Sequence, residues 1–140
     1  MVGRRGILNA MSDDAIDAPE YVDYARRALR TGQLAFEDGD WVGAINRAYY
    51  AIFYAANATL ELQGLERSKH SGVMSVFREK YVKTGKIESE YSDVYGQAFV
   101  SRQKGDYERV KLPTREEAEK AIHGAERFVA RIEKFLGEQK

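Results

Sequence analysis

Apolar residues recur at intervals of three and four along most of the chain, which is the period of an amphipathic α-helix. No segment shows a convincing two-residue alternation of the kind that marks a half-buried strand. The pattern predicts five helices. The first begins at Asp17–Glu20 and ends at Asp38-Gly39. The next three are expected at about 41–62, 69–83 and 88–104, and the last begins at Thr114. Gly105 is expected to end the fourth helix and to leave residues 105–113 as a charged loop.

The short loops between these helices make sequential helices antiparallel. The expected fold is therefore all-α, an up-and-down four-helix bundle with an additional short helix. The second helix is apolar over more than half of its circumference, which is typical of a central helix. Residues 1–16 lack periodicity and are expected to form a disordered N-terminal tail. Residues 17–140 are expected to form a single helical domain.

The composition excludes several kinds of site. The 140 residues include two His and no Cys, so neither a disulfide nor a thiolate metal site is possible. His70 and His123 stand far apart in the sequence, so we expect no His-rich metal site and no cofactor, and we interpret His123 as structural. No apolar run approaches the length of a membrane span, and a chain without cysteine fits the cytoplasm.

The charge is balanced overall but uneven along the chain. Lys and Arg number 22, as do Asp and Glu, and zero net charge argues against a general polycation that binds nucleic acid. Residues 12–40 carry three basic and eight acidic side chains, whereas residues 67–111 carry ten basic and six acidic ones. The balance therefore leaves room for a local positive cleft that faces a phosphate.

A first polar cluster lies on the second helix. Arg47, Tyr50 and Tyr54 are three and four residues apart and share one stripe, beside Asn46 and Phe53. An Arg in the middle of so apolar a helix needs an acidic partner or a polar cleft. The stripe is either core packing, with the Arg held by a carboxylate of a neighbouring helix, or the floor of a cleft where Arg meets phosphate.

Two further clusters lie at helix ends. Lys69 and His70 stand at the start of the third helix, where backbone N–H groups favour an anion, although Ser68 or Ser71 can also be a simple helix cap. Arg102 and Lys104 stand at the end of the fourth helix, where they complement its negative end. Asp106, in the same segment, is a candidate ion-pair partner for Arg102 or Arg47.

Three stretches, in this order, resemble a known family. The run from Ala44 to Ala56, the segment Lys69–Gly72, and Arg102 with Asp106-Tyr107 are together similar to HEPN domains, and most similar to small stand-alone bacterial and archaeal HEPN proteins. The resemblance extends over about residues 20–137. It implies a bundle of four or five helices that usually forms a homodimer. It also implies a neighbouring minimal nucleotidyltransferase, in pairs that look like toxin–antitoxin modules.

The same resemblance implies a possible chemistry. Active HEPN toxins are metal-independent RNases, in which an Arg is followed about one helical turn later by a His. The His helps activate the ribose 2′-OH, and the Arg stabilises the phosphate charge. In this chain Asp106-Tyr107 follows Arg102 in place of that His, and His70 is the remaining imidazole candidate. Tyr107 matches a Tyr that the partner nucleotidyltransferase modifies with a nucleotide in some related toxins.

The expected function is that of a HEPN-domain protein that binds nucleotide or RNA phosphate and partners a minimal nucleotidyltransferase. The candidate phosphate-binding residues are Arg47, Tyr50, Lys69, His70, Arg102, Asp106 and Tyr107. The catalytic candidates are His70, Arg102 and Tyr107. Two alternatives stay open, a metal-independent RNase toxin that acts as a dimer and a non-catalytic helical interaction module.

Overall fold

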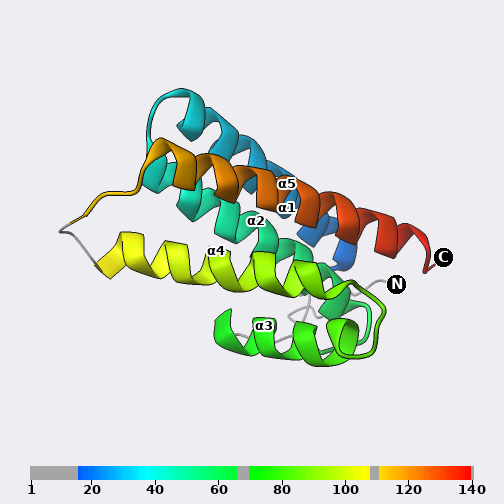
Figure 1. Cartoon of the computed structure of the whole chain (residues 1–140). Helices are drawn as coiled ribbons and strands as arrows, with labels where there is room; N and C mark the ends of the chain where they lie inside the picture. The colour runs from blue at the N-terminus through cyan, green and yellow to red at the C-terminus, as the bar shows by residue number, and fades with distance from the viewer. Residues whose placement is uncertain (1–15, 66–69, 108–110, 140) are drawn as a thin grey trace.

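A computed structural model of the chain describes residues 16–65, 70–107 and 111–139. The tail expected over residues 1–16 lies outside this part, apart from Ile16. The helices are α1 (Ala18–Glu37), α2 (Trp41–Glu61), α3 (His70–Phe77), the π-helical turn η2 (Arg78–Val82), α4 (Ser89–Tyr107) and α5 (Arg115–Gly137). The described residues contain no strand, and the four long helices run up and down (Figure 1). The all-α bundle with one extra short helix is confirmed.

Local polar side chains begin the helices where the sequence predicts. Asp17 with Glu20 and Thr114 with Glu117 both form complete capping boxes, in which each side chain accepts a hydrogen bond from the other residue's backbone N–H. The Asp40 side chain accepts a hydrogen bond from a backbone N–H in the first turn of α2. These caps are local to the starts of α1, α2 and α5; at α1 the Glu61 side chain of α2 also accepts a hydrogen bond of 2.9 Å from the backbone N–H of Ala18.

One predicted helix boundary is wrong. The third helix, expected over about 69–83, does run without a break from His70 to Val82, but its last turn, Arg78–Val82, is π-helical and not α-helical. The fourth helix, expected to break at Gly105, continues to Tyr107. A glycine in a helix costs only about 1 kcal/mol relative to alanine, which packing of the helix against a neighbour offsets.

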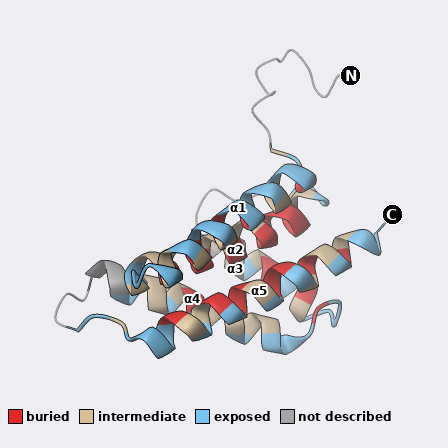
Figure 2. Ribbon diagram, turned by 90° about the horizontal axis from the view of Figure 1, so that it is seen from above, coloured by how far each residue is buried: buried red, intermediate tan, exposed pale blue. Residues whose placement is uncertain are grey.

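α2 is the central helix, because α1, α3, α4 and α5 all pack against it. Its buried alanines let the neighbouring helices approach closely, and its larger buried side chains fill the core. These residues are Ala44, Ala48, Ala51, Ala55, Tyr49, Ile52 and Leu60. Figure 2 shows buried residues where the helices face one another and exposed residues along the outer faces of α1 and α5. Within the described residues, no helix combines the length and apolarity that crossing a bilayer requires.

One face of α2 is covered less completely. Asn46, Arg47, Tyr50 and Tyr54 are half-buried, whereas the opposite side of the same helix is fully enclosed. The base of the Arg47 side chain packs at the α1–α2 contact, because a Cβ added at Gly32 of α1 would lie 3.1 Å from the Arg47 Cβ. This half-buried face of α2 carries the first polar cluster that the sequence predicts.

Candidate phosphate-binding site

The fold brings the first and third polar clusters together. The Arg102 Cζ lies 4.7 Å from the ring centroid of Tyr49 and 5.8 Å from that of Tyr50. The Arg47 Cζ lies 4.7 Å from the same Tyr50 ring. Guanidinium groups at these distances from an aromatic ring are attracted by its negative face. The Tyr50 ring is therefore close to two positive charges, one from α2 and one from α4.

An amide holds Arg47 in place. Asn46 Oδ1 accepts hydrogen bonds from Arg47 Nε at 3.1 Å and from Arg47 Nη2 at 3.0 Å. The sequence left two interpretations for Arg47, a carboxylate partner from a neighbouring helix or a polar cleft. Within the described part of the chain, the hydrogen-bond partner of Arg47 is this neutral amide. The side chain of Asp106, the carboxylate that the sequence offers as a partner, lies outside that part, so both interpretations of Arg47 stay predictions.

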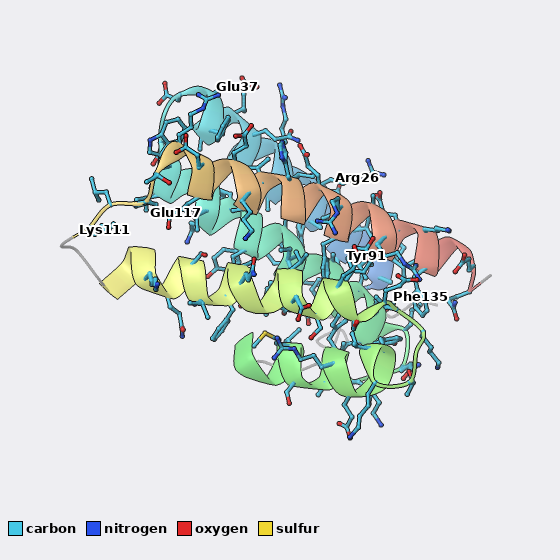
Figure 3. All side chains as sticks on the ribbon, in the orientation of Figure 1. Arg26, Glu37, Tyr91, Lys111, Glu117 and Phe135 are labelled. Carbon is cyan, nitrogen blue, oxygen red and sulfur yellow. The ribbon has the colours of Figure 1, made fainter. Side chains whose placement is uncertain are left out.

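A groove opens where α2 begins, α4 ends and the chain turns into α5. Its volume is about 190 Å³. It is lined by Val42, Ile45, Asn46, Val100, Ser101, Arg102, Lys104, Lys111, Leu112, Pro113 and Glu117. Figure 3 shows Lys111 and Glu117 at this end of the bundle. Among the described residues, the lining holds three cations and one carboxylate, an excess of positive charge in a chain that is neutral as a whole.

Glu117, the carboxylate among the described residues of the groove, already has a structural role. Glu117 Oε1 accepts a hydrogen bond of 2.7 Å from the backbone N–H of Thr114. Its hydrogen bonds with Thr114 lower the pKa of Glu117, and the charges of Lys111 and Lys104 lower it further. The Glu117 carboxylate is therefore ionised at neutral pH and directed at the start of α5.

Tyr49 supports the site without supplying acid–base chemistry. It is fully buried, and its ring lies under the Arg102 guanidinium. Burial raises the pKa of Tyr49 to about 12, and the positive charge of Arg102 only partly opposes this. The phenol is therefore protonated at neutral pH, where it acts as a packing surface and not as a base.

Four of the predicted site residues cannot be placed fully. Lys69 and the side chains of His70, Asp106 and Tyr107 lie outside the described residues. The backbone of His70 begins α3, which packs against α2. Asp106 and Tyr107 belong to the last turn of α4, on the same helix as Arg102. The contribution of Lys69 and His70 to the groove stays a prediction.

Sequence reasoning missed three residues of the groove as site residues: Asn46, Lys104 and Lys111. Lys104 was interpreted only as a complement to the helix end. Lys111 had a usable signal, because an antiparallel α4–α5 pair places the residues just before α5 beside the last turns of α4. Across the described ranges, no group of three or more His, Cys, Asp or Glu side chains forms a metal site, and His123 is exposed on α5.

Comparison with known proteins identifies the family to which this chain belongs. The HEPN domain family matches residues 18–135, which is most of the chain. The chain therefore belongs to the HEPN domain family, as its sequence motifs indicate.

Individual relatives agree with this assignment. A UPF0332 protein of Thermotoga maritima is 38% identical over 116 residues, which cover 83% of this chain and 88% of that protein. A Methanocaldococcus jannaschii protein named "Putative toxin MJ0605" is 38% identical over 134 residues, covering 96% of this chain and 98% of its own. The crystal structure of TT1696 from Thermus thermophilus superposes with a TM-score of 0.72. That structure is 20% identical and covers 84% of this chain and 97% of its own, so it supports the fold alone.

Proposed function

We propose that this HEPN protein binds the phosphate groups of a nucleotide or of RNA at the groove around Arg102. The observation that carries the proposal is that Arg102, Lys104 and Lys111 line one groove beside a second guanidinium, Arg47. Guanidinium and ammonium groups gathered in this way suit phosphate oxygens. The neutral amide of Asn46 holds Arg47 without cancelling its charge.

A titration with ATP, followed by calorimetry or by NMR shifts, tests the proposal. Arg102→Gln keeps the length of the side chain but removes its charge. A hydrogen bond to a charged group contributes about 1.5–3 kcal/mol, so we expect the Kd to rise about tenfold or more. Arg26→Gln on α1 is the matched control, because its guanidinium pairs with Glu133 away from the groove. Absence of binding at millimolar nucleotide, or equal affinities of the two variants, would contradict the proposal.

We also propose that the protein is a homodimer that works in the cytoplasm with a minimal nucleotidyltransferase, as part of a toxin–antitoxin-like module. The HEPN resemblance supports this, as does the word toxin in the name of the Methanocaldococcus relative. Light scattering on the purified protein distinguishes a monomer from a dimer. Co-purification with the product of the adjacent gene tests the partner. A monomer, or a neighbour that is not a nucleotidyltransferase, would overturn the respective part.

A metal-independent RNase is a second candidate function, which the name of the same relative favours. In this chain Asp106 stands where active members of the family carry His, so any general acid–base role would fall to His70. RNA incubated with the protein in EDTA tests this candidate. Cleavage that His70→Ala and Arg102→Gln both abolish would support it. Intact RNA at high protein concentration would remove it.

A further inference from the structure

A second groove, of about 740 Å³, lies between α4 and α5. In Figure 1 these two helices lie in front of α2 and spread apart toward the end of α4. They approach closely at Gly124, where an added Cβ would lie 3.1 Å from Val94 Cγ1. Both helices pack more extensively on α2 than on each other, so the space between them reaches down to Ile52 of α2. We call this space the α4–α5 groove.

The floor of the α4–α5 groove is apolar and short of side-chain volume. It includes Ile52 of α2, together with Ala98 of α4 and Ala121 and Gly124 of α5, which carry a methyl group or no side chain at all. Val100, which is 50% exposed, extends the apolar surface to the edge of the groove. Since burial of apolar surface is favourable, this floor suits an occupant that supplies large apolar side chains.

The two rims of the groove carry opposite charges. Lys120 and Arg127 lie along the α5 rim, and Asp93 and Gln97 lie along the α4 rim. Lys120 forms no ion pair within the described residues. Arg127 donates a hydrogen bond to Glu90 through Nη2, which leaves further N–H groups of the guanidinium for a ligand. An occupant therefore meets positive charge on one side and negative charge on the other.

Two further charged residues line the groove but are already bound within the chain. Glu117 is held at the start of α5 by its hydrogen bonds with Thr114. The Arg78 guanidinium donates hydrogen bonds to the side chain and the backbone carbonyl of Ser92. The rim charges that face an occupant are therefore those of Lys120, Arg127 and Asp93.

The shape of the groove favours an α-helix over other occupants. α5 lines it from Glu117 to Arg127, which at about 1.5 Å per residue is about 15 Å, or three turns of helix. An extended strand would find no partners for its backbone, because the N–H and C=O groups along α4 and α5 are bonded within these helices. A second copy on a two-fold axis would place the same concave groove on both sides of the contact, so the two floors would not meet.

We propose that the α4–α5 groove binds an amphipathic α-helix of a partner protein, with one acidic and one basic flank. The apolar stripe of this helix packs on the floor, its acidic flank faces Lys120 and Arg127, and its basic flank faces Asp93. Lys120 and Arg127 are seven residues apart on α5, so acidic residues at the same spacing on the partner helix face both. This interaction goes beyond phosphate binding and does not depend on it.

Fluorescence anisotropy with labelled synthetic helices, cross-linked to hold their helical form, tests the proposal. Both probes are about four turns long and carry leucines three and four residues apart, so that they present one apolar stripe. The first probe has glutamates along one flank and lysines along the other, and the second has lysines along both flanks. An exposed ion pair contributes up to about fivefold in affinity, so wild-type protein should bind the first probe about fivefold or more tightly than the second.

Charge reversal on the α5 rim should invert this preference. Lys120→Glu combined with Arg127→Glu makes both rims acidic, so the second probe should then bind more tightly than the first. Lys134→Glu is the matched control, because Lys134 is exposed on α5 seven residues after Arg127 but does not line the groove. This variant should keep the wild-type order of affinity.

A substitution in the floor tests the apolar part of the contact. Ala121→Phe places a ring in the groove and should weaken both probes about tenfold or more, because the leucines of the probe are then kept from the floor. Circular dichroism confirms folding of each variant. If Ala121→Phe does not fold, the charge reversals at the exposed positions Lys120 and Arg127 still decide the outcome.

NMR on the protein with the first probe locates the contact, and the backbone amides of Ala98, Ala121 and Gly124 should shift. Shifts confined to other helices, no binding at millimolar probe, or equal affinity of wild-type protein for the two probes would overturn the proposal. An inverted preference in Lys134→Glu would overturn it as well, because the charges of the groove would then not decide binding. Ala121→Phe that changes the oligomeric state in light scattering, with probe affinity unchanged, would assign the groove to a second copy.

Discussion

Two buried tyrosines are predicted to respond in opposite ways to the same substitution. Tyr81 and Tyr95 are 1% and 0% exposed, and both rings pack 5.9 Å from that of Phe77. The Tyr81 hydroxyl donates a hydrogen bond of 2.6 Å to the backbone carbonyl of Thr59. The Tyr95 hydroxyl is buried and makes no hydrogen bond to any residue in the described part of the chain. Burial raises the pKa of both phenols, and for Tyr95 well above its ordinary value.

The magnitudes follow from what each hydroxyl does. Thr59 lies in the last turn of α2, where carbonyl groups lack intrahelical donors, and Tyr81 satisfies this one. Tyr81→Phe leaves the Thr59 carbonyl unsatisfied, which should reduce the free energy of unfolding by about 1–3 kcal/mol. Tyr95→Phe removes a desolvated hydroxyl without breaking a bond, so stability should stay the same or rise by about 1 kcal/mol.

Urea unfolding followed by circular dichroism measures both changes on the same scale. The dependence of the unfolding free energy on urea should be the same for wild type and both variants, because neither substitution alters the surface exposed on unfolding. A gap of about 2 kcal/mol between Tyr81→Phe and Tyr95→Phe is expected. Equal destabilisation would refute the reasoning, since it would mean that the Tyr95 hydroxyl has a partner equivalent to the Thr59 carbonyl.

Two further predictions concern helix packing and capping. Thr114→Ala removes the cap of α5 and should cost about 1 kcal/mol by thermal unfolding. The pKa of Glu117 should stay below 4.5 in an NMR titration of this variant, because the backbone N–H of residue 114, the largest cause of the lowering, is retained. Because folding lowers that pKa, the wild-type stabilisation exists above 4.5 and is lost as the pH falls through the folded value. Gly32→Leu should cost about 1–3 kcal/mol through overpacking against Arg47, whereas Gly137→Leu, with open space at its Cβ, should cost little.

The parts of the fold that were predicted correctly depend on local chemistry. A capping box such as that of Thr114 and Glu117 lies within four residues, and the apolar period of α5 is visible without knowing its neighbours. The π-helical turn is accompanied by a contact that its first residue makes with another helix. Arg78 Nε donates a hydrogen bond of 2.8 Å to Ser92 Oγ on α4, and Gly96 leaves room for this guanidinium to pass. The local sequence pattern carries no information about this contact between Arg78 and α4.

In the candidate site, too, local sequence predicts some features and tertiary contacts determine the others. Arg47 and Tyr50 were found together because helical spacing puts them on one face of a single helix. The contact of Arg102 with Tyr49 depends on how far α4 is shifted along α2, and the sequence does not encode that register in any short segment. Lys111 enters the groove only because the chain turns back at the end of α4. The residue types of the site were therefore predictable, whereas their grouping needed the tertiary structure.

The distribution of ion pairs explains how a neutral chain presents a positive groove. Arg26 pairs with Glu133, Arg127 with Glu90 and Arg131 with Glu88, so these charges offset one another along the sides of the bundle. Zero net charge therefore hides an asymmetry. Carboxylates balance the cations on α1 and α5, whereas in the described part of the groove one carboxylate, Glu117, stands beside three cations. Exposed ion pairs are screened by salt and contribute little to stability. Their main effect is to neutralise charge on the sides of the bundle. The phosphate ligand that we propose would therefore meet positive charge at the end of the bundle where α4 ends and α5 begins.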